Sequence, residues 1–120
     1  MKVAINIKTD DWNKIINGLV KDGWRITSKY EGYDRGIDFD FLILRNGSDK
    51  VFFGWENWLE GEIKCSDRIF THLAKRFDMD FTFGKPNSLK LSVIILTRLQ
   101  NLIYSFVSIK MGRGDKKKSG

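Results

Sequence analysis

Carboxylates and aromatic side chains gather in one stretch of an otherwise basic chain. Residues 30–62 hold eight acidic and three basic residues, whereas the whole chain of 120 residues has a net charge of +6. The stretch ends in WENWLEGE, where two tryptophans three positions apart stand among acids, and we do not expect all of them to be buried. Large stiff aromatics supply contact area and carboxylates attract cations, so the stretch predicts a surface that binds a protein partner. The residues expected to form this surface are Tyr30, Tyr33, Asp34, Glu56, Trp58, Glu60 and Glu62.

Some of the same carboxylates have the outline of a metal-dependent nuclease. Asp38 with Glu62 and Lys64 follows the Asp…Glu-x-Lys pattern, in which the acids hold Mg²⁺ and the lysine positions the attacking water. However, Asp38 and Asp40 alternate with phenylalanines, as expected of a half-buried strand whose acidic face points to solvent. Glu62 is expected in a loop, whereas the nuclease pattern needs it on a strand. The sequence therefore favours a non-enzymatic protein over this alternative.

Thiol and imidazole chemistry has few candidates. The chain has one cysteine, Cys65, and one histidine, His72, so it has neither a disulfide framework nor the ligands of a zinc site. No phosphate-binding glycine loop or metalloprotease motif is present. We expect Cys65 to be a packing residue, His72 to lie at the surface, and the protein to need no cofactor or metal.

The basic remainder of the chain supports a different hypothesis. Cations in residues 64–76 and in the tail at 112–120 are compatible with nucleic-acid binding, which would weaken steeply as salt rises. The alternative is that the tail, which contains three consecutive lysines at 116–118, is a flexible solubilising extension. The sequence favours that second interpretation.

The elements that must position these residues begin with a strand and a helix. Val3, Ile5 and Ile7 alternate with polar residues, as in a short strand. A helix is predicted from Thr9, whose hydroxyl is expected to cap it, to Gly23, with apolar residues at helical spacing. Those apolar residues are Trp12, Ile15, Ile16, Leu19 and Val20.

An antiparallel meander is predicted next, over residues 24–55. Its sharpest signal is Asn46-Gly47, a dipeptide typical of a hairpin turn. A second helix is expected to start at Ser66-Asp67, and residues 79–83 are predicted to form a short strand. A third helix is predicted from Asn87 or Ser88, and its apolar stripe is Leu91, Ile95, Leu99, Leu102 and Phe106.

Together these elements predict one α+β domain over residues 1–111, followed by the basic tail. We expect a three- to five-stranded antiparallel meander packed by about three helices on one side. The most apolar stretch, residues 89–109, contains Arg98, Gln100 and Asn101, so we do not expect it to span a membrane. The first residues do not have the apolar length of a signal peptide, and a cytoplasmic protein is expected.

Three blocks of the sequence, at residues 24–27, 36–40 and 55–63, are similar in character to small bacterial proteins without catalytic motifs. With its size and its acidic-aromatic segment, the chain resembles immunity proteins of contact-dependent growth inhibition systems. The resemblance implies stoichiometric inhibition of a cognate toxin domain, by covering its active site or substrate surface. Many immunity proteins against nucleases are acidic overall, whereas this chain is basic. The resemblance therefore requires the acidic segment itself to make the contact.

Overall fold

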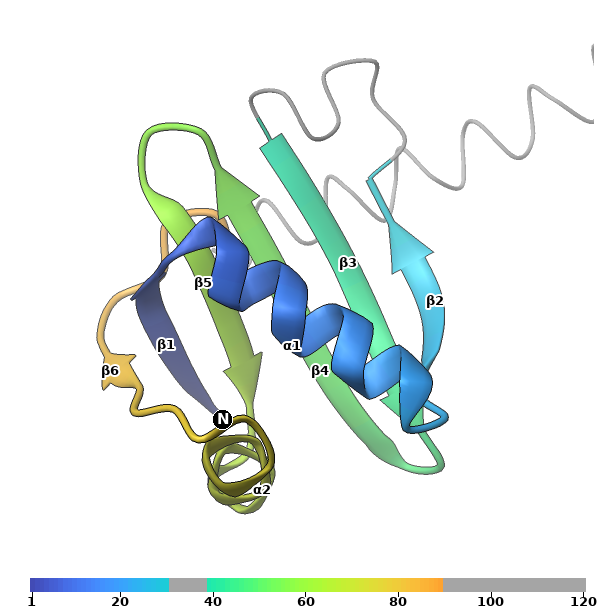
Figure 1. The fold of residues 1–120 in the computed structure, drawn as a ribbon. Coiled ribbons are helices and arrows are strands. Elements are labelled where there is room, and N and C mark those ends of the chain that lie inside the picture. Colours follow the sequence, from blue (N-terminus) through green and yellow to red (C-terminus); the bar gives the residue numbers. More distant parts are fainter. Residues whose placement is uncertain (31–38, 90–120) are drawn as a thin grey trace, which may run out of the picture.

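The protein is a six-stranded antiparallel sheet with two helices, as seen in a computed structural model that describes residues 1–30 and 39–89. The sheet order is β2-β3-β4-β5-β1-β6, and α1 crosses one face of it (Figure 1). The elements are β1 (Lys2–Ile7), α1 (Thr9–Lys21), β2 (Arg25–Lys29), β3 (Phe39–Asn46), β4 (Asp49–Glu56), β5 (Glu60–Cys65), α2 (Asp67–Phe77) and β6 (Thr82–Phe83). The predicted single α+β domain is confirmed, with more strands than expected. The third predicted helix and the boundary at residue 111 lie outside the described residues.

Helix α1 ends where the sequence predicts, but it does not begin with the predicted cap. Lys8 occupies the capping position and makes no side-chain cap hydrogen bond, so the capping role expected of Thr9 is wrong. At the other end, Gly23 has a φ of 99°, and its N–H donates to the carbonyl of Val20 at 3.1 Å. The N–H of Trp24 donates to the carbonyl of Leu19, which completes a Schellman motif.

The predicted meander is confirmed in strands β2, β3 and β4. The β3–β4 hairpin pairs Asn46 with Asp49 and turns through Gly47, which has a φ of 60°. Beyond this meander, β4 continues into a second hairpin with β5, and β1 lies between β5 and β6. The loop expected around Glu62 is therefore wrong, because Glu62 lies within β5. Helix α2 starts as predicted, with the Ser66 hydroxyl accepting from the Ile69 N–H at 3.4 Å.

Both faces of the sheet carry buried apolar residues. The first face packs against α1 and α2 through strand residues that include Leu42, Leu44 and Phe53. The second face carries a separate cluster formed by Phe41, Ile43, Phe52 and Leu89. The expected division of β3 into an apolar face toward the helices and an acidic face toward solvent is therefore wrong. Asp40 is half-buried and accepts from the Phe41 N–H at 2.9 Å, while Asp38 lies outside the described residues.

Ion pairs tie surface carboxylates to nearby cations away from the tip of the β4–β5 hairpin. Lys2 lies 3.2 Å from Asp67, and Arg68 pairs with Asp49. Arg76 donates to Asp22 at 2.9 Å, and this hydrogen bond lowers the pKa of the Asp22 carboxyl. In the part of the chain that the structure describes, no helix is long and apolar enough to cross a membrane.

Candidate protein-binding surface

The tip of the β4–β5 hairpin carries the most exposed large aromatic side chain of the described residues. Glu56 pairs with Glu60 across the hairpin, and the Leu59 N–H donates to the Glu56 carbonyl at 3.1 Å to close the turn. Trp58 lies within this turn, and 84% of its surface is exposed. Leu59 beside it is 41% exposed. Both apolar side chains are exposed to solvent in a turn. They therefore contribute little to the packing of the described residues, and their exposure calls for another reason.

Two other tryptophans fix the hairpin to helix α1. The indole N–H of Trp55 donates to the Thr9 hydroxyl at 3.0 Å, and that of Trp12 donates to the Glu62 carbonyl at 3.2 Å. The Trp12 ring also lies directly over Gly61, where an added Cβ would sit 2.5 Å from its Cδ1. These contacts hold the base of the hairpin, so that the exposed tip extends from a packed support.

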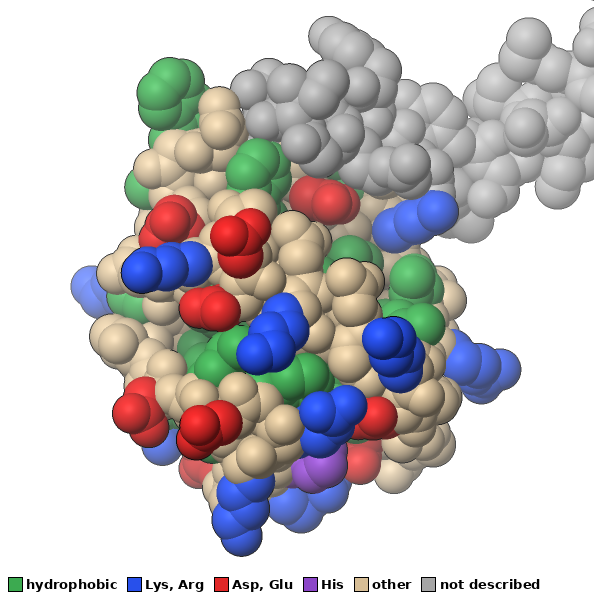
Figure 2. All heavy atoms as spheres, in the orientation of Figure 1, with side chains coloured by type: hydrophobic (Ala, Val, Ile, Leu, Met, Phe, Trp, Pro, Cys, Tyr) green, Lys and Arg blue, Asp and Glu red, His purple; other side chains and the backbone are tan. Residues whose placement is uncertain are grey.

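The first turn of α1 adds carboxylates next to this hairpin. Asp10 and Asp11 follow Thr9, the residue that Trp55 contacts. Figure 2 shows acidic side chains over the start of α1, below apolar side chains at the hairpin end, with a basic side chain among them. We define the hairpin-tip surface as these two aspartates with four residues at the end of the hairpin: Asp10, Asp11, Glu56, Trp58, Leu59 and Glu60.

The carboxylates of the hairpin-tip surface differ electrostatically from three aspartates elsewhere in the fold. Within residues 1–30 and 39–89, none of its four carboxylates has an ion-pair partner. By contrast, Asp22, Asp49 and Asp67 are each paired with a cation. Within the described residues, no ion pair therefore neutralises the carboxylates of the hairpin-tip surface, although the chain as a whole is basic.

The structure brings together only part of the predicted surface. Glu56, Trp58 and Glu60 meet at the hairpin tip. Tyr30 is half-buried instead, with its ring edge-on to Phe39 at a centroid distance of 5.0 Å. Tyr33 and Asp34 lie outside the described residues. The sequence reasoning missed Asp10 and Asp11 because acids in a first helical turn are already explained by the helix dipole.

Glu62 is buried, which removes it from any exposed surface. Only 2% of the residue is exposed, and both carboxylate oxygens accept from the Asn87 N–H at 3.0 and 2.9 Å. Oε1 also accepts from the Leu89 N–H at 3.1 Å. The interpretation of Glu62 as a partner-binding residue is therefore corrected: its carboxylate is buried because it satisfies backbone donors.

The same contacts occupy the carboxylate that the nuclease hypothesis requires. Lys64 lies over the Phe52 ring at 6.0 Å from its centroid, and Asp38 falls outside the described residues. Among the described residues, no group of three or more potential ligands is arranged to hold a metal ion. The described part of the nuclease pattern thus serves packing and backbone hydrogen bonding.

The thiol of Cys65 and the imidazole of His72 lie in different environments. Cys65 is fully buried, and burial raises the pKa of its thiol to about 12, so the thiol stays protonated at neutral pH. His72 is exposed on α2. The two residues therefore do not form a nucleophile and base.

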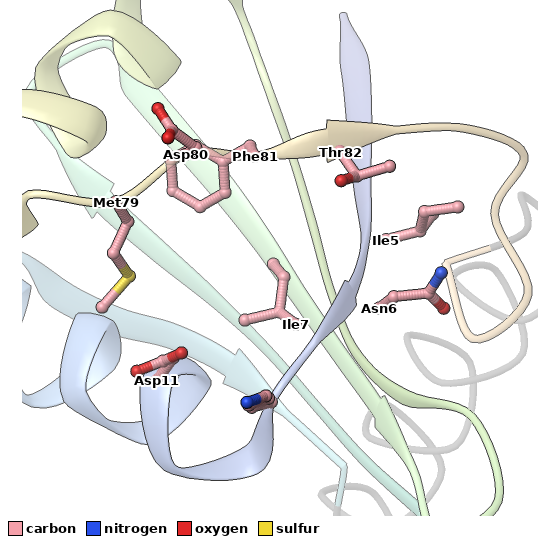
Figure 3. Close-up of a pocket in the computed structure, with 9 residues that line it drawn as sticks. Ile5, Asn6, Ile7, Asp11, Met79, Asp80, Phe81 and Thr82 are labelled. Carbon is pink, nitrogen blue, oxygen red and sulfur yellow. The ribbon is translucent and has the colours of Figure 1, made fainter.

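A pocket of about 340 Å³ lies between the β1–α1 junction and the segment that follows α2. Ile7 and the Phe81 ring extend toward each other in its centre, while the Asp80 carboxylate points away (Figure 3). Asp11 lines the helix side. Its polar groups do not converge on one point, so the geometry favours neither a catalytic nor a metal site there.

Comparison with known proteins gave no matching family model, no matching curated protein and no matching solved structure.

Proposed function

We propose that this protein is a non-enzymatic binding module that engages a basic partner protein through the hairpin-tip surface. The observation that carries the proposal is Trp58, exposed at the end of an anchored hairpin beside carboxylates without ion pairs. Tryptophan is enriched among the residues that dominate binding energy, because it buries a large area with few rotatable bonds. Uncompensated carboxylates speed encounter with a cationic surface and select against acidic partners.

The most concrete form of this function is immunity against a toxin. A nuclease toxin binds phosphates through lysine and arginine side chains, and a surface that offers Glu56, Glu60 and the two aspartates of α1 is complementary to them. Covering such a site would neutralise the toxin without catalysis. The chain as a whole is basic, so the carboxylates of the hairpin-tip surface must make this contact locally.

The ion pairs also bear on the nucleic-acid alternative. Of the cations in residues 64–76, Arg68 and Arg76 are both engaged by carboxylates. These carboxylates would compete with phosphates for the two guanidinium groups. The described residues therefore favour a protein partner over a nucleic acid.

A capture experiment with two matched variants tests the proposal. The full chain is used as bait in lysate of the cells that encode it, in parallel with Trp58→Ala and Ile26→Ala. Ile26 is 50% exposed on β2 near the opposite end of the sheet, so it controls for loss of an exposed apolar side chain. We expect a basic protein that wild type and Ile26→Ala retain, and that Trp58→Ala binds at least about thirtyfold more weakly. Equal retention by all three baits would overturn the hairpin-tip surface.

The charge contribution has its own matched control. Glu60 and Asp78 are both exposed and both have a positive φ, of 62° and 52°. Glu60→Gln and Asp78→Asn remove the same charge from comparable backbone positions, and we expect only Glu60→Gln to slow association with the captured protein. Expression of that protein alone should arrest growth, and co-expression of wild type but not Trp58→Ala should restore it. A captured protein that is harmless when expressed alone would contradict the immunity function while leaving protein binding intact.

A further inference from the structure

The second face of the sheet is apolar, and neither described helix covers it. Phe41, Ile43 and Phe52 are buried there, whereas α1 and α2 pack on the first face. Lys50 and Lys64 flank this cluster, with their ammonium groups 4.9 and 6.0 Å from the centroid of the Phe52 ring. An apolar sheet face with a charged margin is suited to an amphipathic element.

A residue near the end of the described chain, Leu89, packs on this second face. Leu89, the last described residue, is fully buried in the cluster. It passes so close to β4 that a Cβ added at Gly54 would lie 2.8 Å from the Leu89 side chain and 2.6 Å from the Ser88 hydroxyl. Glycine at position 54 is thus required for the chain to approach the sheet here.

A buried carboxylate fixes this approach. Glu62 accepts hydrogen bonds from the N–H groups of Asn87 and Leu89, two residues apart, at 2.9 to 3.1 Å. Hydrogen bonds to an ionised acceptor are stronger than neutral ones, and burial of the carboxylate keeps water from competing. Glu62 therefore holds residues 87–89 against the second face of the sheet.

We propose that the second face of the sheet is the docking surface for the segment of this same chain that follows, residues 90–109. The sequence of that segment predicts an amphipathic helix with the stripe Leu91, Ile95, Leu99, Leu102 and Phe106. Twenty helical residues extend about 30 Å, enough to reach either edge of the sheet from β4 when strands are spaced about 4.8 Å apart. The first stripe residue follows Leu89 by two positions, so the segment starts on the face that it would cover. Glu62 is the positioning residue for this docking, independent of the hairpin-tip surface.

Disulfide trapping in the full chain tests the proposal. In a Cys65→Ala background, one cysteine replaces Lys64 or Lys50 at the margin of the face, and a second is scanned singly through positions 91–106. Disulfides form only when the Cα atoms lie within about 7 Å, so the yield reports proximity. We expect monomeric disulfide products whose yield peaks every three to four residues, on the stripe rather than at Arg98 or Asn101.

Three outcomes are distinguishable on a non-reducing gel, for variants that keep the wild-type circular dichroism spectrum. Periodic monomeric products support docking of the chain's own segment. Disulfide-linked dimers with the same period would show that a second copy supplies the segment, and yields without a period would show that the segment does not lie on this face; either result overturns the proposal. Glu62→Gln should also speed amide exchange at Leu89 by about tenfold or more, and Glu60→Gln should not. Unchanged exchange in Glu62→Gln would overturn the positioning role of Glu62.

Discussion

Replacing Glu62 by glutamine should lower the stability of the protein far more than expected for the exposed residue that the sequence predicted. The carboxylate accepts three hydrogen bonds from two backbone N–H groups, and Oε1 accepts from both of them. A glutamine amide whose oxygen takes the Oε1 position would direct its NH₂ group at the Asn87 N–H, which lies 2.9 Å from Oε2 in the wild type. Hydrogen bonds to a charged group contribute about 1.5–3 kcal/mol each, but burial of the charge offsets part of their sum. We therefore expect Glu62→Gln to lower the free energy of unfolding by about 2–3 kcal/mol. That is a large part of the 5–15 kcal/mol typical of a domain.

Urea denaturation followed by tryptophan fluorescence measures this loss, and the denaturant slope should not change. Glu60→Gln is the matched control, because Glu60 lies two residues earlier on β5 and is exposed. It should change the free energy of unfolding by no more than about 0.5 kcal/mol. If Glu62→Gln behaved like this control, the hydrogen bonds of the buried carboxylate would not stabilise the fold, and our account of residues 87–89 would be refuted.

Four further predictions follow from the backbone and burial of neighbouring residues. Glu60→Gly should raise the free energy of unfolding by about 1 kcal/mol in urea denaturation, because glycine tolerates the φ of 62° at this position; a gain in Glu60→Ala as well would contradict this reason. Gly61→Ala should lower it by about 1–3 kcal/mol in thermal denaturation, because the new Cβ would lie 2.5 Å from Trp12 Cδ1. Cys65 should react with a thiol reagent at pH 8 only after unfolding, since burial raises its pKa from 9.0 to about 12; rapid labelling of the native protein would refute this. The folded state holds that thiol proton more tightly, so this stabilisation is complete below pH 9 and is lost between about pH 9 and 12, which denaturation at increasing pH measures.

Local signals predicted several elements because each acts within a few residues. Asn46-Gly47 turns the β3–β4 hairpin, Gly23 ends α1, and Ser66 caps α2. In each case, backbone freedom or a nearby hydroxyl determines the conformation. The corresponding predictions were confirmed without knowledge of tertiary contacts.

Strand β5 could not be predicted in this way. Its sequence, EGEIKC, has charged residues on one side of the pleat, which is typical of a solvated face. The structure buries Glu62 on that side because donors 25 and 27 residues further along the chain satisfy its carboxylate. No pattern in the sequence near Glu62 predicts these distant hydrogen-bond donors. The second apolar face of the sheet was missed as well, since helices were expected on one side of the sheet only, whereas Phe41 and Ile43 are buried on the other side.

Trp55 and Trp58 show how the candidate surface depends on distant residues. They lie three positions apart, but Trp55 donates to Thr9, 46 residues earlier, whereas the described residues leave Trp58 exposed. The acids between and after them divide similarly: Glu62 turns inward to backbone donors, and Glu56 and Glu60 remain at the tip. Without Glu62, the charge for binding must come from the tip together with the first turn of α1. A partner that fits this surface must therefore present cations together with an apolar site for Trp58.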